Sequence, residues 1–217
     1  MSRKTGGADS RLMKAALDML PHTGLSGLSV RGVAARAGVN LGMFHYHFRT
    51  KGEFDRRVMS DFYEKFFSGF MGAVESAGGE SPLERLRRGV LTAARFVREH
   101  RPFLVAFGKD LLADNREAIS FARRNFPRHV VVLMKLIGEC RRAGQIRRMP
   151  VIQVLPFIFG AVMAPIIAVS LLEKLLPLGV RGLPLAMLRR MVSSDRMLEE
   201  RLDLALSALG PRAGKSR

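Results

Sequence analysis

The sequence predicts an all-α protein, and three observations carry this prediction. Apolar residues recur at helical spacing along most of the chain, as at Leu12, Ala16 and Met19. Gly, Pro and small polar residues interrupt that pattern, most clearly from Gly78 to Pro82. The sequence contains neither a convincing alternating strand pattern nor an internal repeat. The 217 residues can bury a sizeable core, either in one large domain or in a small domain joined to a larger one.

The first helix is expected from Asp9 to Leu20. Asp9 or Ser10 is a suitable N-cap, because a side-chain oxygen there can accept a backbone N–H of the first turn. Pro21 and Gly24 follow, and we expect them to end the helix.

Two short helices and a long one come next. Ser29 is the cap candidate of the first, which Gly38 ends, and Asn40 can cap the second. Lys51 begins a longer helix, which we expect to end near residues 77–79. The remaining sequence predicts helices at 81–100, 101–113, 115–143, 151–176 and 185–209.

The segment from Val151 to Leu176 is apolar around its whole circumference and is long enough to cross a bilayer. Gln153, Pro156 and Pro165 argue against a membrane span. A helix at the centre of a helical protein, or at a large dimer interface, has the same pattern. We therefore expect no membrane contact.

The composition favours a polyanionic partner. Lys and Arg number 36 against 19 Asp and Glu, which gives a formal charge of +17, and nucleic acid or an anionic surface is the expected partner class. A generally arginine-rich surface is the alternative explanation. Residues 1–60 carry +6 (10 basic, 4 acidic) and the remainder +11, so positive charge is not confined to the N-terminal part of the chain. Cys140 is the only cysteine, so no intramolecular disulfide or cysteine-based zinc site is expected. The N-terminal residues lack a signal-peptide core, and a reducing cytoplasm fits best.

The segment from Ser29 to Phe54 has the form of a helix-turn-helix. Ala34 lies four residues before Gly38, where a small side chain allows two helices to cross closely. Gly38 can adopt the left-handed conformation of the turn, and Val39 can fill the angle between the helices.

The second helix of this motif separates its side chains onto two faces at 100° per residue. The side that we expect to pack against the core holds Leu41, Phe44 and Phe48. The opposite, exposed side holds a glycine, two larger groups and flanking imidazoles: Gly42, Met43, Tyr46, His45 and His47. Such a face on a basic helix suits the major groove of DNA, where Met or Tyr can touch a thymine methyl and His or Tyr can bond base edges or phosphate.

Two basic side chains flank this face. Lys51 lies in the first turn of the following helix, where a phosphate could receive both its ammonium and free helix N–H groups. Arg31 could reach a guanine or a phosphate. Either could be a solvated surface charge if taken alone, but their convergence favours DNA. The candidate DNA-binding residues are Arg31, Asn40, Gly42, Met43, His45, Tyr46, His47 and Lys51.

The stretch LSVRGVAARAGVNLGMFHYHFRTKGEF resembles the DNA-binding domain of tetracycline-repressor-type (TetR family) transcriptional regulators, and the resemblance covers about residues 9–60. The positions that match the family's pattern include Tyr46, His47, Phe48 and Lys51. Two positions depart from it: Met43 stands where Thr or Ser is usual, and His45 where Tyr is usual. Both departures bear on the operator sequence.

The resemblance implies a sequence-specific regulator of transcription, which we expect to be a repressor, although no residue distinguishes repression from activation. It implies a DNA-binding domain at 1–60 and a helical effector-binding and dimerisation domain at 61–217. It also implies a homodimer that binds a double-stranded operator and makes its dimer contact through 151–176 and 185–209. A small apolar effector would modulate the DNA affinity, and no cofactor or metal is expected.

If an effector pocket exists, we expect aromatic and apolar side chains of the middle helices to line it. Ordinary core packing is the alternative for each of these side chains, and for any single one it is favoured over ligand contact. The candidates are Phe96, Phe103, Phe107, Phe121, Phe126, Phe157, Phe159 and Met163.

The sequence also bears on two other classes of protein. An enzyme is not expected, because the histidines are dispersed and no HExxH, GxSxG or P-loop spacing occurs. The close pair His45 and His47 lacks a third metal ligand on its own helix. A protein that coats DNA without sequence preference is the second alternative, and it would bind an operator and a random duplex about equally.

Overall fold

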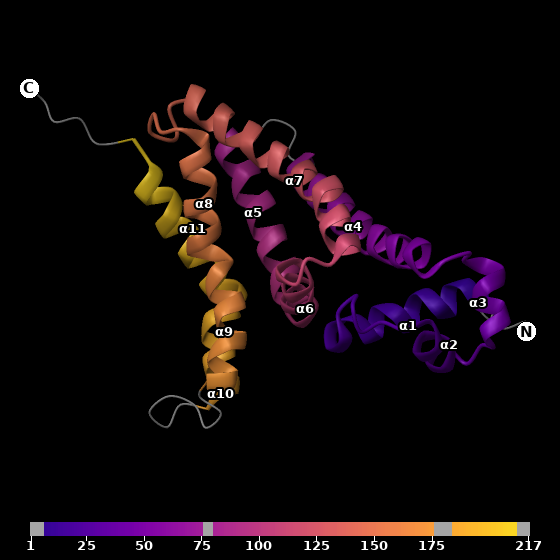
Figure 1. Ribbon diagram of the computed structural model, residues 1–217. Helices are drawn as coiled ribbons and strands as arrows, with labels where there is room; N and C mark the ends of the chain where they lie inside the picture. The colour runs from indigo at the N-terminus through magenta and orange to yellow at the C-terminus, as the bar shows by residue number, and fades with distance from the viewer. Residues whose placement is uncertain (1–6, 76–79, 176–183, 212–217) are drawn as a thin grey trace, which may run out of the picture. The chain divides into compact units, whose positions relative to one another are not determined.

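A computed structural model of the chain describes residues 7–75, 80–175 and 184–211 (Figure 1). Every regular element within these ranges is an α-helix, which confirms the all-α prediction. The chain divides into two compact units. The first comprises Met1–Lys65 and Pro102–Asn125, and the second comprises Phe66–Arg101 and Phe126–Arg217.

The first unit contains the three N-terminal helices and parts of three later ones. They are α1 (Ala8–Thr23), α2 (Val30–Ala37), α3 (Leu41–His47), the first part of α4 (Lys51–Glu75), nearly all of α6 (Arg101–Leu112) and the first part of α7 (Arg116–Arg142). The predicted end of α4 at 77–79 lies outside the described residues.

Both ends of α1 differ from the prediction. The N-cap is Gly7, so the expectation that Asp9 or Ser10 caps the helix is wrong. Both residues lie inside the helix, where the carboxylate of Asp9 in the first turn interacts favourably with the helix dipole. Pro21 also lies inside α1, because it removes only one hydrogen bond near the C-terminal end of the helix. Gly24, with φ 64°, is the C-cap.

Aromatic rings of α3 and α4 form the centre of the first unit. The ring centroids of Phe44, Phe48 and Phe54 lie 4.8 to 5.6 Å apart. All three side chains are buried, as are Leu12 and Leu20 of α1. Each fully buried side chain of this size contributes about 1.5–3 kcal/mol. This core fixes the position of α3.

The second unit contains α5 and the C-terminal helices. They are α5 (Pro82–Glu99), α8 (Val151–Val162), α9 (Ala164–Leu175), α10 (Leu185–Ser193) and α11 (Asp195–Leu209), together with the remaining parts of α4 and α7. Gly89 lets α5 approach α4 closely, because a Cβ there would lie 3.0 Å from Cγ2 of Val74. Salt bridges from Arg87 to Asp203 and from Arg95 to Asp195 join α5 to α11.

The predicted single helix at 151–176 is wrong, because the segment forms α8 and α9 with a 42° bend between them. Pro165 accounts for the break: it has no N–H to donate to the carbonyl of Ala161, and its ring would clash with that carbonyl in a continuous helix. In the first turn of α9 the missing N–H costs nothing. Pro156 is accommodated inside α8.

The predicted single helix at 185–209 is also wrong. The chain leaves the helical conformation at Ser194, with φ −66° and ψ 154°, and this residue separates α10 from α11. The Ser194 hydroxyl accepts the Met197 N–H at 3.4 Å, so Ser194 is the N-cap of α11.

Among the residues that the structure describes, no single helix is both long enough and apolar enough to cross a membrane. The bent pair Val151–Val162 and Ala164–Glu173 meets the length and composition test only when the two helices are taken together.

Candidate DNA-binding face

The turn between α2 and α3 has the geometry that the sequence predicts. Gly38 has φ 63° and ψ 39°, and a Cβ there would meet nothing within 4 Å, so the backbone conformation and not the available space requires glycine. The Val39 N–H donates to the carbonyl of Ala34 at 3.1 Å. Ala34 is buried, as a close helix crossing requires. The helix-turn-helix prediction is confirmed.

Two side chains cap the helices of this motif as predicted. The Ser29 hydroxyl accepts the Gly32 N–H at 3.0 Å, and Oδ1 of Asn40 accepts the Met43 N–H at 2.8 Å. Each cap is worth about 1 kcal/mol. For Asn40 this bond occupies the carbonyl oxygen, and the amide group remains for an outside partner.

The faces of α3 agree with the prediction except at Leu41. Phe44 and Phe48 are buried, whereas Tyr46 is 81% exposed and Met43 is 37% exposed. Leu41 was expected to pack against the core, and this expectation is wrong because it is 39% exposed. It is the first residue of a seven-residue helix, so no earlier turn of α3 covers it.

The two imidazoles of α3 differ in their surroundings. His45 is exposed, with its ring edge-on to Phe44. His47 is only partly exposed, and its Nε2 is buried with no hydrogen-bond partner in the described part of the chain. His45 therefore presents the more accessible polar group to the exposed face.

Arg31 and Gly42 are both exposed, as their predicted role requires. An added Cβ at Gly42 would lie 3.4 Å from Oδ1 of Asn40, an ordinary van der Waals contact. The protein itself therefore has room for a side chain at this position. Close approach by an outside molecule stays the predicted reason for the glycine.

Lys51 is engaged inside the protein. Its Nζ lies 2.6 Å from Oδ2 of Asp55 and donates to the carbonyl oxygen of Leu25 at 3.3 Å. The side chain is nevertheless 40% exposed. If Lys51 contacts a phosphate as predicted, its ammonium must do so while it is also hydrogen-bonded to Asp55 and to the carbonyl oxygen of Leu25.

Sequence reasoning missed Asp55, although its i,i+4 spacing from Lys51 on one helix was a usable signal. The residue is 2% exposed, and its Oδ1 has no hydrogen-bond partner in the described residues. Burial raises the pKa of the Asp55 carboxyl, and the hydrogen bond and charge of Lys51 oppose that rise.

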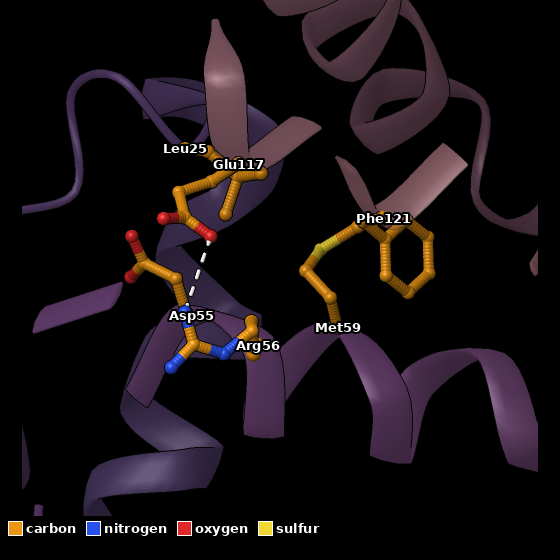
Figure 2. A pocket seen from close by; sticks show the side chains of 6 residues that line it. All are labelled: Leu25, Asp55, Arg56, Met59, Glu117 and Phe121. Carbon is orange, nitrogen blue, oxygen red and sulfur yellow. Dashed lines mark ion pairs between the residues drawn. The ribbon is translucent and has the colours of Figure 1, made fainter. Parts of the chain in front are cut away.

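Beside Asp55 the surface has a shallow hollow with an empty volume of about 150 Å³ (Figure 2). An ion pair of 3.6 Å between Arg56 of α4 and Glu117 of α7 lies at it. The lining residues are Leu25, Asp55, Arg56, Met59, Glu117 and Phe121. Phe121 is the one member of this set that was predicted to line an effector pocket.

The predicted effector-pocket residues are divided between the two units. In the first unit, the ring of Phe107 lies 5.9 Å from that of Phe103 and 5.8 Å from that of Phe121. The second unit holds the other five. Of these, Phe96 is half-buried and Met163 is buried, whereas three are exposed: Phe126, Phe157 and Phe159. Their role in binding a ligand stays a prediction.

Comparison with known proteins places the motif in a family. Residues 12–55 match the profile described as "Bacterial regulatory proteins, tetR family". The HTH-type transcriptional repressor KstR2 of Mycolicibacterium smegmatis is 31% identical over 99 residues, which cover 46% of this chain and 47% of the relative. The chain thus spans about half the length of the curated relatives it matches.

Solved structures share the fold over nearly the whole chain. The fatty acid degradation regulator FadR from Bacillus halodurans has a TM-score of 0.70 at 16% identity, covering 97% of this chain and 100% of that one. The transcriptional regulator FadR from Bacillus subtilis, in complex with stearoyl-CoA, has a TM-score of 0.68 at 14% identity, covering 91% of this chain and 97% of that one. The family and the curated relative that this chain resembles are transcriptional regulators and not enzymes.

Proposed function

Because the chain belongs to the tetR family of bacterial regulatory proteins, we propose that it is a cytoplasmic repressor that binds a DNA operator as a homodimer. A small apolar molecule, bound by the helices beyond residue 60, changes its affinity for the operator. The candidate DNA-binding residues remain those of the turn and of α3, with Arg31 and Lys51 beside them.

The outward face of α3 is the observation that carries this proposal. Tyr46 is 81% exposed beside Met43 and His45, and the ring contact of its side chain is with His47 of the same helix and not with the core. The same helix is held at its start by the Asn40 cap and from within by Phe44. A rigid helix with large exposed side chains is what reading the major groove requires.

Exposed apolar side chains on the C-terminal helices support a homodimer. Monomeric proteins rarely expose large contiguous apolar surfaces, and a second copy of the chain would cover them. The side chains concerned are Ile152, Phe157, Phe159, Leu171, Leu175, Met187, Met191 and Leu204.

An effector acts only if its affinities for the DNA-binding form and the other form differ. A hundredfold difference supplies about 2.7 kcal/mol, which suffices to release most of the operator. Stearoyl-CoA in the B. subtilis neighbour has a long apolar chain, and the predicted lining here is aromatic and apolar. Long-chain acyl compounds are therefore the first effectors to test.

Selection of genomic fragments by the purified chain tests the proposal. A selected fragment should be bound at least about 10³-fold more tightly than a random duplex of equal length at physiological salt. A ratio near one would identify a DNA-coating protein and remove the proposal. Analytical ultracentrifugation of the same sample should give the mass of a dimer.

A further inference from the structure

The loop between α1 and α2 is held by a side chain from far along the chain. Asp110 of α6 lies 84 and 85 residues from this loop, and its carboxylate accepts three hydrogen bonds from it. Oδ2 accepts the Leu25 N–H at 2.6 Å. Oδ1 accepts the Ser26 hydroxyl at 2.5 Å and the Ser26 N–H at 3.4 Å. Asp110 is 3% exposed, and its bond to the Leu25 N–H is buried, whereas the two bonds to the exposed Ser26 are partly buried.

The loop is shaped to receive this carboxylate. Gly24 has φ 64°, and a Cβ there would lie 2.7 Å from Oδ2 of Asp110. A side chain at position 24 would therefore be strained and would displace the carboxylate. The same loop is held from another side, because Lys51 donates to the carbonyl oxygen of Leu25.

Asp110 is itself held firmly. The backbone carbonyl of Asp110 accepts the Asn115 N–H at 2.9 Å, across a turn in which Asp114 has a positive φ of 55°. Oδ1 of Asn115 then accepts the Ala118 N–H at 3.0 Å at the start of α7. The end of α6 is thus tied to the following helix, and the carboxylate has little freedom to leave the loop.

From these contacts we propose that Asp110 is a positioning residue for DNA binding. It fixes the loop that joins α1 to α2, and through that loop the placement of α2 and of α3 beside it. The DNA-reading part of the molecule is then incomplete at residue 60, because it requires the segment Pro102–Asn125 as well. This inference rests on the proposed function and goes beyond it by adding a residue outside the segment that matches the family profile.

Variants of the full-length chain test this inference against the fragment selected by the wild-type chain. Asp110→Ala leaves the Leu25 N–H and the Ser26 groups without an acceptor, and it should weaken binding of that fragment about tenfold or more. Asp110→Asn keeps one acceptor and should fall between Asp110→Ala and the wild type. Gly24→Ala keeps the Asp110 carboxylate but displaces it from the loop, and it should reproduce the loss of affinity.

Two further measurements separate positioning from general stability. Hydrogen exchange should show loss of protection at residues 25–26 and across 41–47 in Asp110→Ala, at a temperature where circular dichroism reports full helix content. In a double-mutant cycle, Ser26→Ala and Asp110→Ala should be non-additive in fragment affinity. Asp61→Ala is the matched control, because it removes an aspartate of the same unit whose ion pair with Arg57 is largely exposed. It should leave fragment affinity unchanged.

The outcomes are distinguishable. If the wild type does not prefer the selected fragment to a random duplex, the proposed function fails and this inference fails with it. If the wild type discriminates and a folded Asp110→Ala variant binds the fragment within twofold of it, only the positioning role is overturned. If Asp110→Ala does not fold, wild-type affinity in folded Asp110→Asn and Gly24→Ala overturns the role, and a graded loss supports it.

Discussion

The two compact units differ in how exposed the aspartates are that connect their helices and loops. In the first, Asp55 and Asp110 are 2% and 3% exposed. Asp110 accepts hydrogen bonds from the α1–α2 loop, and Asp55 pairs with Lys51, which donates to the same loop. In the second, the side chains of Asp195 and Asp203 are each 55% exposed and lie in ion pairs with arginines. The second unit also contains less exposed ionisable groups: Arg101, which is 8% exposed and pairs with Glu173, the buried thiol of Cys140 and the half-buried imidazole of His129.

This difference indicates what holds each unit in shape. Exposed ion pairs contribute about 0–1 kcal/mol each and permit many geometries. A buried carboxylate that accepts backbone N–H groups permits few, because losing an acceptor leaves those donors unsatisfied. The first unit, which carries the candidate DNA-binding face, depends on charge to fix a loop. The second combines aromatic and aliphatic packing with ion pairs, and the pair of Arg101 with Glu173 is less exposed than those of Asp195 and Asp203.

The largest expected effect concerns His129. Burial lowers its pKa to about 4 from the ordinary 6.5, so the unfolded chain binds the proton more readily than the folded chain. Stability is therefore full above pH 6.5 and is lost as the pH falls toward about 4, by on the order of 3 kcal/mol. His129→Leu should remove most of this dependence in urea unfolding measured across that range. The exposed His22→Gln is the control, and an unchanged slope in His129→Leu would contradict the assignment.

The next effect tests the buried pair of the first unit. Lys51→Met leaves the Asp55 carboxylate buried without its cation and should lower the unfolding free energy by about 2 kcal/mol at neutral pH. The folded-state pKa of Asp55 is already raised, so its contribution is most favourable below its ordinary 3.8 and is lost as the pH rises through the folded-state value. Removing Lys51 should move that loss to higher pH.

A pair with the same spacing supplies the control for Lys51. Arg57 and Asp61 form an i,i+4 pair whose side chains are 69% and 46% exposed. Arg57→Met should change the unfolding free energy by less than about 0.5 kcal/mol. Adding Asp55→Asn to Lys51→Met should restore much of the lost stability, and failure to do so would show that the aliphatic stem of Lys51 was the stabilising part.

A smaller effect is expected from the exposed side of the first unit. Tyr46→Ala should alter the unfolding free energy by less than about 0.5 kcal/mol, because the ring is 81% exposed. It should nevertheless reduce the preference for the selected fragment over a random duplex about tenfold, or 1.4 kcal/mol. Leu112→Ala, at an 89% exposed position on α6, is the control that should leave the preference intact. Fluorescence anisotropy titrations with both duplexes measure the two affinities.

The smallest effect is expected at the surface of the second unit. Asp203→Ala removes the salt bridge of 2.9 Å to Arg87 and should cost no more than about 0.5 kcal/mol at low salt. The difference from wild type should shrink further in 1 M salt, because exposed charges are screened. A loss of 2 kcal/mol or more would erase the distinction between the two units.

Local signals made the N-terminal motif predictable. Ser29, Gly38 and Asn40 act on backbone groups within four residues of themselves, so their roles follow from short sequence spacing. The breaks at Met163 and Ser194 were also locally encoded, by Pro165 and by a serine that precedes Asp195, yet in both segments apolar residues continue at helical spacing across the break, which favoured a single helix.

Other features depend on contacts that sequence spacing does not reveal. The bonds from Asp110 to Leu25 and Ser26 join residues 84 and 85 positions apart, and no pattern around Asp110 indicates a loop as its partner. Sequence spacing also does not reveal where the first compact unit ends, which the prediction placed at residue 60. The compact unit extends along α4 to Lys65 and takes in 102–125 through tertiary packing, while the functional boundary itself stays a prediction.

The dependence of the α1–α2 loop on Asp110 affects the order of events during synthesis. The ribosome must add 84 residues after Ser26 before the carboxylate that binds it exists. At about 5–20 residues per second, this interval is roughly 4–17 seconds. A nascent chain in that interval already carries the basic N-terminal helices but lacks the residue proposed to set their arrangement, so on this proposal the DNA-binding face is not fixed until about half of the 217 residues are made.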